Sequence, residues 1–234
     1  MLQTHSLMPL AAGLVPATLE NKTISNLAHQ IMVTDKGHLD TGLTGTYFLF
    51  KYLMESGRND LAFTIANQTT FPSYGFFLQK GFTTWPEQWD VSKKDLSKMH
   101  GCFNGIGLWF IEGVAGIRVH ASEDPPLTIR AGVDAGDISW ASGHRAALHG
   151  KAVSSWALGA HGFEHNVTIP GNARAKILIP CDTGVTGVTE SGKRVSTAKG
   201  VTVQQNDRPL LCFFSLENPG LNVYLLPLAH AVFY

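Results

Sequence analysis

The chain has 234 residues, of which 44% are hydrophobic and 15% are charged, so it is expected to bury a core rather than stay disordered. Its 18 basic and 18 acidic residues leave no net charge, which argues against nucleic acid or an acidic membrane surface as its partner. It has no apolar run of membrane-spanning length and no signal peptide at its N-terminus, and its localisation is left open.

Helical periodicity dominates the first half of the chain. Apolar residues recur at helical spacing at Ile24, Leu27, Ala28 and Ile31. Such patterns predict the end of a helix at 5–14 and further helices over 18–34, 44–56, 59–67 and 103–115. Apolar residues nearly surround the helix at 44–56, so it should be buried. Residues 70–98 are expected to form a loop with brief extended pieces.

Beyond residue 120 the periodicity changes to that of β-strands. Extended runs separated by Gly, Pro, Asn and Asp are expected at 127–130, 137–141, 147–158, 164–169, 173–179, 201–205, 210–216 and 221–227. Seven or eight short strands at this spacing are typical of an antiparallel β-sandwich. The chain is therefore expected to divide into a helical domain at 1–118 and a sandwich domain at 119–234, with 119–126 as the linker.

The predicted helices do not form an obvious closed bundle. They are few and strongly apolar, and the first residues fall where a helix is already under way. Helices that are hydrophobic on most sides need neighbours on most sides, and helical toroids supply them by adding further pairs around a ring. We therefore expect the helices to be the C-terminal portion of a larger helical domain.

The stretch 81–90 carries the strongest chemical signal. Trp85 and Trp89 offer flat apolar faces of the kind that stack on sugar rings, and Glu87 lies between them. A carboxyl group partly shielded from water in this way suits acid–base catalysis. Pro86 fixes the backbone just before it. The alternative is an ordinary aromatic loop whose Glu87 pairs with a nearby base.

Two histidines and two aspartates are further candidates. His38 and Asp40 lie in a loop with three glycines, for which turn formation and helix capping are the alternative explanation. The alternative for His100 is a buried histidine bonded to the backbone. Asp90 either orients a neighbouring side chain or caps its own loop, and we favour the cap.

No metal site is predicted, because the histidines of the strand region have no suitably spaced acidic or cysteine partner. The three cysteines, Cys102, Cys181 and Cys212, are widely spaced and form no CxxC motif. Neither a zinc knuckle nor a disulfide framework is therefore implied, and their disulfide state is left open.

Four stretches together resemble the C-terminal part of bacterial and fungal α-L-rhamnosidases of glycoside hydrolase family 78. They are GHLDTGLTGT at 37–46, FPSYG at 71–75, the stretch 81–90 with its Thr-Thr and Glu-x-Trp-Asp, and SKMH at 97–100 followed by Trp109 and AGI at 115–117. The resemblance covers essentially the whole chain and is strongest over 37–118. It implies part of an (α/α)6 barrel followed by a β-sandwich.

The resemblance also implies roles for individual residues. Glu87 matches the general base, His100 an active-site histidine, and Trp85 and Trp89 the aromatic surroundings of the rhamnose; His38 is a further candidate for substrate binding. The implied reaction is inverting hydrolysis of terminal α-L-rhamnosyl bonds in a rhamnose-containing glycoside or polysaccharide, with no organic cofactor and no metal. The family's general acid lies on an earlier loop, and no stretch before residue 37 matches it.

Two other functions stay open. A chain without the acid would be a non-catalytic fragment or a sugar-binding remnant. Related helical toroids also carry rhamnose-releasing polysaccharide lyases, which use β-elimination.

The motif itself departs from the family pattern, which usually reads Thr-Thr, an apolar residue, Trp and Glu. Here Trp85 comes one position earlier and Pro86 precedes Glu87, which leaves the position of the aromatic wall open.

Overall fold

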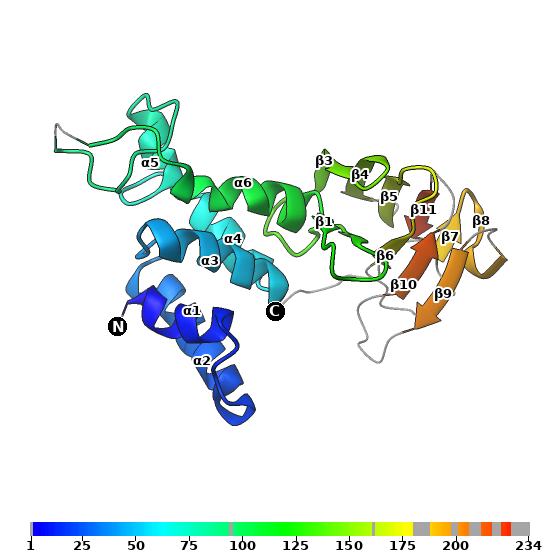
Figure 1. The fold of residues 1–234 in the computed structure, drawn as a ribbon, viewed down its shortest axis with the longest axis horizontal. Helices are drawn as coiled ribbons and strands as arrows, with labels where there is room; N and C mark the ends of the chain where they lie inside the picture. The colour runs from blue at the N-terminus through cyan, green and yellow to red at the C-terminus, as the bar shows by residue number, and fades with distance from the viewer. Residues whose placement is uncertain are drawn as a thin grey trace. The chain divides into compact units, whose positions relative to one another are not determined.

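The computed structural model describes residues 2–93, 96–160, 162–179, 188–197, 201–205, 212–216 and 221–225. The chain divides into two compact units, Met1–Trp109 with Asp134–Gly136 and Phe110–Val133 with Asp137–Tyr234. The α-helices belong to the first unit and the strands to the second (Figure 1). Within the described residues, no helix is both long and apolar enough to span a membrane.

The described part of the first unit contains six α-helices. They are α1 (Gln3–Ala11), α2 (Ala17–His29), α3 (Leu43–Glu55), α4 (Asn59–Ala66), α5 (Tyr74–Gln79) and α6 (Gly105–Trp109). The π-helix η1 (Gln30–Thr34) extends α2, and the 3₁₀-helix η2 (Gly101–Asn104) precedes α6. The prediction that residues 70–98 are mostly loop with brief extended pieces missed α5. Ser73 begins this helix, because its hydroxyl oxygen accepts the Phe76 N–H at 3.0 Å and satisfies one of the free amides of the first turn.

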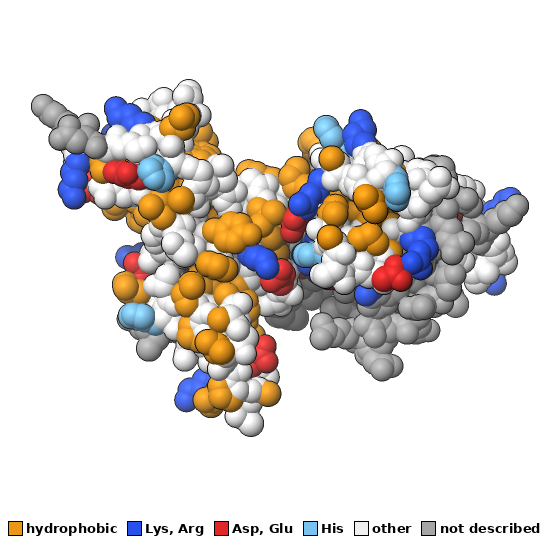
Figure 2. Space-filling view, in the orientation of Figure 1, with side chains coloured by type: hydrophobic (Ala, Val, Ile, Leu, Met, Phe, Trp, Pro, Cys, Tyr) orange, Lys and Arg blue, Asp and Glu red, His pale blue; other side chains and the backbone are white. Residues whose placement is uncertain are grey.

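Helix α3 is buried on one side only. Leu49, Phe50 and Leu53 are buried on that side, whereas Tyr47 is 42% exposed. The expectation that apolar residues all round would bury the whole helix is therefore wrong. Hydrophobic side chains are also visible elsewhere on the surface of the helical unit (Figure 2).

A buried asparagine ties three segments of the first unit together. Asn59, at the start of α4, donates from its amide to Asp134 at 2.9 Å and accepts the indole N–H of Trp109 at 3.2 Å. Nearby, Gly136 adopts a left-handed conformation (φ +60°), and a Cβ there would lie 2.1 Å from the ring of Phe63. These contacts explain why residues 134–136 pack with the helices although strands flank them in sequence.

The second unit opens with the π-helix η3 (Phe110–Val114) and contains two sheets. One has the order β1-β2-β6-β10-β9 and the other β3-β4-β5-β11-β7-β8. The bounds in chain order are β1 (Ile117–Val119), β2 (Leu127–Arg130), β3 (Trp140–Ala147), β4 (Gly150–Gly159), β5 (Gly162–Thr168), β6 (Ala175–Ile179), β7 (Val188–Glu190), β8 (Lys193–Arg194), β9 (Val201–Gln205), β10 (Cys212–Leu216) and β11 (Leu221–Leu225), with a short 3₁₀-helix η5 (Val195–Thr197) before β9.

The strand predictions depart from the structure in pairing and in bounds. Strands β2 and β6 run parallel, so the expectation of purely antiparallel sheets is wrong for this pair. A parallel pair needs a long crossover connection, and β3, β4 and β5 lie between the two in sequence. The predicted strand 147–158 corresponds to β4 but begins too early: Ala147 ends β3, and β4 begins at Gly150 after a turn in which His149 has φ 72°. Strands β1, β7 and β8 were not predicted.

Buried side chains from both sheets form one hydrophobic cluster. Ile129 and Ile177 come from one sheet, and Trp156, Phe163 and Val167 from the other. The indole N–H of Trp156 donates to the carbonyl oxygen of Val114 at 2.8 Å, so the largest buried side chain of this unit also has its polar atom satisfied. Cys102, in the first unit, is an exposed free thiol. Cys181 lies outside the described residues, and Cys212 is part of β10.

A buried histidine gives the second unit an expected pH dependence. His165 is fully buried, its Nε2 lies 2.9 Å from the Ser154 hydroxyl, and its Nδ1 has no hydrogen-bond partner among the described residues. Burial disfavours the charged ring and lowers the pKa of His165 to about 4, against 6.5 when exposed. As the pH falls below 6.5, the unfolded chain takes up this proton before the folded unit does. Stability present above pH 6.5 is therefore lost as the pH falls toward 4.

The expected loss is about 3 kcal/mol between neutral pH and pH 4, since each pKa unit corresponds to about 1.4 kcal/mol. Amide hydrogen exchange of β4 and β5 measured across this range would detect it. Replacing His165 by Leu together with Ser154 by Ala should flatten this part of the pH profile. An unchanged profile in the double variant would rule His165 out as its source.

Candidate active site

Three hydrogen bonds hold Glu87 and His100 on neighbouring segments of the long loop between α5 and η2. The backbone N–H of Glu87 donates to the Ser97 carbonyl oxygen at 3.0 Å, and the N–H of His100 donates to the Trp85 carbonyl oxygen at 2.7 Å. The hydroxyl group of Thr84 donates to the Lys98 carbonyl oxygen. Residues 84–87 and 97–100 therefore lie side by side, without the ladder of a regular sheet.

The Glu87 carboxylate and the His100 ring face each other across this clamp. Oε2 of Glu87 lies 3.9 Å from Nδ1 of His100, and the two side chains are 34% and 35% exposed. The same nitrogen lies 3.0 Å from the Ser97 hydroxyl, which is a hydrogen bond, whereas 3.9 Å is too long for one. The carboxylate is thus within reach of water, and a protonated His100 would form an ion pair with it.

The two tryptophans rest on an aromatic cluster. Trp85 and Trp89 both meet the ring of Tyr74 edge-on, with centroid distances of 5.0 and 5.4 Å. Trp89 also stacks on Phe77 at 5.0 Å with an interplanar angle of 15°, and lies 4.2 Å from Phe103. Stacking on Phe77 occupies one face of Trp89. The aromatic surface left for a sugar is therefore smaller than the sequence alone suggests, although both side chains remain half-buried rather than fully enclosed.

Tyr74 anchors this cluster, and reasoning from the sequence gave it no role. It is 2% exposed, its hydroxyl group donates to the Phe103 carbonyl oxygen at 2.7 Å, and burial raises its pKa well above the usual range. The next residue, Gly75, is required by close packing, since a Cβ there would lie 2.4 Å from the backbone oxygen of Gln68. The only sequence signal was the FPSYG stretch at 71–75.

The glycine-rich loop after η1 reaches the site through a backbone atom. The Thr41 carbonyl oxygen accepts the indole N–H of Trp89 at 2.7 Å. His38 points elsewhere: its Nδ1 lies 3.0 Å from the Asp35 carbonyl oxygen, and its Nε2 lies 2.7 Å from the Thr70 hydroxyl. The structure therefore brings Trp85, Glu87, Trp89 and His100 onto one loop, whereas the hydrogen bonds of His38 go to the turn at 35–36 and to Thr70.

The two candidate aspartates have different surroundings. The pKa of Asp40 is raised by burial and by the nearby Asp35, and a hydrogen bond from the Gln3 backbone opposes this shift. Asp90 is exposed and accepts the Ser92 N–H at 3.0 Å, and this hydrogen bond lowers its pKa. It therefore caps its own loop. Across the described residues, no group of three or more His, Cys, Asp or Glu side chains could hold a metal ion.

The chain matches two family models in succession. Residues 1–114 match the bacterial α-L-rhamnosidase six-hairpin glycosidase domain, and residues 127–194 match the bacterial α-L-rhamnosidase C-terminal domain. An α-L-rhamnosidase from Streptomyces avermitilis is 31% identical over 188 residues, which are 77% of this chain and 18% of that protein. One from Alteromonas sp. is 29% identical over 203 residues, covering 81% and 21%.

Solved structures give the same result. The α-L-rhamnosidase from Dictyoglumus thermophilum superposes with a TM-score of 0.84 at 25% identity, over 97% of this chain and 25% of that one. The Streptomyces avermitilis α-L-rhamnosidase complexed with L-rhamnose gives 0.81 at 26% identity, over 95% and 21%. The chain thus spans about a fifth to a quarter of the length of these relatives. Its two matched regions follow one another as a glycosidase domain and a C-terminal domain, and the chain belongs to the bacterial α-L-rhamnosidase family.

Proposed function

We propose that this chain supplies the general-base side of an α-L-rhamnosidase active site, with Glu87 as the base. The observation that carries this proposal is the position of the Glu87 carboxylate. It is one-third exposed on a clamped loop, 3.9 Å from His100, and the two tryptophans that flank it in the sequence rest on an aromatic cluster. A general base must be held within reach of the water that it deprotonates, and a clamped, one-third exposed carboxylate suits that role.

The reaction is inverting hydrolysis of a terminal α-L-rhamnosyl bond in a glycoside or polysaccharide. Glu87 takes a proton from water as the water oxygen attacks the anomeric carbon. A second carboxylic acid protonates the leaving oxygen from the opposite face. In inverting enzymes the two carboxyl groups stand about 6.5–9.5 Å apart, because the water lies between one of them and the sugar. We leave the acid unassigned among the described residues.

His100 lies beside the proposed base, Trp85 and Trp89 flank it in the sequence, and the three would shape the sugar site. His100, held by Ser97, presents a polar ring beside the carboxylate. Trp85 and Trp89 offer apolar surface for the C–H face of the sugar. His38 remains a proposed substrate-binding residue only for a ligand that extends toward Thr70, because its ring nitrogens face Thr70 and Asp35.

We propose that 1–118 form part of an (α/α)6 barrel and 119–234 a β-sandwich, with the difference that 110–118 cluster with the strands and Asp134–Gly136 with the helices. Support comes from the match of residues 1–114 to a six-hairpin domain and from two sheets whose buried residues share one cluster. Sandwiches bury the inner faces of two sheets in this way.

The test uses the protein at its full natural length with an aryl α-L-rhamnoside. Proton NMR of the first turnovers should show β-L-rhamnose before mutarotation, because inversion converts the α-linked sugar to the β-anomer. α-L-Rhamnose as the first product would contradict inversion. With a rhamnose-containing polysaccharide, a product that absorbs in the ultraviolet would indicate a lyase. Binding of the substrate without turnover would indicate a sugar-binding remnant.

A further inference from the structure

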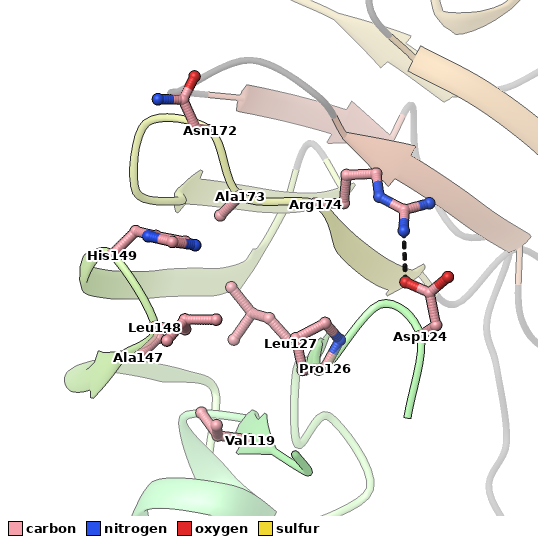
Figure 3. A pocket seen from close by; sticks show the side chains of 10 residues that line it. All are labelled: Val119, Asp124, Pro126, Leu127, Ala147, Leu148, His149, Asn172, Ala173 and Arg174. Atoms are coloured by element: carbon pink, nitrogen blue, oxygen red, sulfur yellow. Dashed lines mark hydrogen bonds and ion pairs between the residues drawn. The ribbon is translucent and has the colours of Figure 1, made fainter. Parts of the chain in front are cut away.

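The strand unit contains a pocket of about 160 Å³ that lies apart from the Glu87 loop in sequence. Its walls come from the β1–β2 segment, the β3–β4 turn and the β5–β6 loop, all within the second unit. Figure 3 shows the ten residues that line it: Val119, Asp124, Pro126, Leu127, Ala147, Leu148, His149, Asn172, Ala173 and Arg174.

The centre of the pocket is apolar and two of its sides are polar. Leu127 is 3% exposed, whereas Leu148 is 67% exposed. In Figure 3 these side chains lie between His149 on one side and the Arg174–Asp124 pair on the other. A ligand here would meet hydrocarbon on one surface and hydrogen-bonding groups at its edges.

Charge and donor chemistry favour a neutral polyol. Arg174 donates to Asp124 in an ion pair, so the two formal charges compensate each other and neither a bare anion nor a bare cation is favoured. A carboxylate only accepts hydrogen bonds, and a guanidinium only donates them. A ligand that both donates and accepts at neighbouring atoms satisfies this pair, and the adjacent hydroxyl groups of a sugar do so.

The turns that carry the walls have specific backbone conformations. His149 and Asn172 are two of the few residues other than glycine with positive φ, at 72° and 60°. A Cβ at Gly150 would lie 3.3 Å from Pro170, so the β3–β4 turn packs against the segment that follows β5. Drug-sized ligands occupy pockets of about 300–1,000 Å³, and a pocket of this smaller size has room for a single ring.

We propose that this pocket binds one neutral 6-deoxyhexose ring, with L-rhamnose as the ligand. The methyl group and C–H face would lie against Leu148 and Leu127, and the hydroxyl groups would meet Asp124, Arg174 and His149. The choice of rhamnose among deoxy sugars rests on the proposed function. The proposal that the pocket binds a deoxyhexose rests on the pocket residues alone. The strand unit would then hold a sugar end close to the protein independently of turnover.

The test is a titration of the ¹⁵N-labelled 234-residue chain with L-rhamnose and with L-mannose, which differs from it only by a hydroxyl group on C6. L-Rhamnose should shift the amide signals of residues 148–149 and 172–174, and L-mannose should bind more weakly, since its added hydroxyl group would face the apolar wall. Asp124→Asn combined with Arg174→Met should weaken L-rhamnose binding about tenfold or more. Arg58→Met, which breaks another exposed Arg–Asp pair, is the matched control and should change nothing.

A second variant tests the pocket independently, in case the double variant does not fold. Leu148→Ser removes apolar wall at a side chain that is already 67% exposed, and it should also weaken binding. The proposal is overturned if L-rhamnose leaves these turns unshifted, if L-mannose binds equally well, or if neither variant weakens binding. If L-rhamnose shifts only the amide signals around Glu87, the pocket proposal is overturned and the proposed function stands. L-Rhamnose binding at the pocket in a protein that fails to hydrolyse rhamnosides would overturn the proposed function and leave the pocket proposal standing.

Discussion

Glu87→Gln should lower turnover of an aryl α-L-rhamnoside by about 10²–10⁴-fold in the protein at its full natural length, the range typical of a lost general base. Glutamine keeps the shape of the side chain and removes its basic oxygen. The KM should change little, because the Trp85 and Trp89 rings, which we propose to contact the sugar, are untouched. Steady-state kinetics on purified wild type and variant would measure both quantities.

Glu55→Gln is the matched control. Glu55 forms an exposed i, i+4 ion pair with Lys51, far in sequence from the clamped loop, and its substitution should leave turnover unchanged. Thermal melts of all three proteins should coincide to within the small effect of a surface charge. Full activity in the folded Glu87→Gln variant would show that the base is another residue, with His100 or Asp90 next in line.

Trp156→Ala should destabilise the strand unit by about 3–5 kcal/mol, the range for removing a buried aromatic side chain. Trp156 is 2% exposed, packs beside Phe163 and donates its indole N–H to Val114. The substitution leaves a cavity and also leaves the Val114 carbonyl oxygen without this donor.

Trp140→Ala supplies the comparison. Trp140 lies on β3, which pairs with the β4 strand that carries Trp156, and it is 69% exposed, so its loss should cost little. Amide hydrogen exchange in β4 and β5 reports on this unit alone, which avoids assuming that the whole chain unfolds in one step. Equal protection in the two variants would mean that the shared core of the two sheets is not what stabilises them.

The helices were predictable where their periodicity was long, and the failures have specific causes. α2 and α3 show apolar spacing over three turns or more. α5 spans six residues and is set by the hydroxyl group of Ser73 and by the packing of Tyr74 and Phe77, which periodicity does not detect. The β3–β4 turn was missed because His149 takes the left-handed conformation usually given to Gly or Asn. The parallel pairing of β2 with β6 depends on tertiary contacts between distant segments.

The candidate site was identified through the resemblance, since carboxylates between aromatic residues are common. What no sequence pattern gave is how the loop is supported. The Thr41 oxygen accepts from the Trp89 indole, the Tyr74 ring meets both tryptophans edge-on, and the Ser97 oxygen accepts from the Glu87 amide. These contacts join residues 10 to 48 positions apart. The residues next to Glu87 in the sequence therefore do not predict these contacts.

Because residues 84–87 are hydrogen-bonded to 97–100, the position of Glu87, the proposed base, does not depend on the length of the loop between these two segments. The hydrogen bond from Glu87 to Ser97 closes a loop of backbone, so residues inserted after Asp90 lengthen this loop without changing the hydrogen-bonded residues at its base. The entropy of closing a loop rises only slowly with its length. This stretch is therefore a place where new segments can be inserted while Glu87, the proposed base, keeps its position.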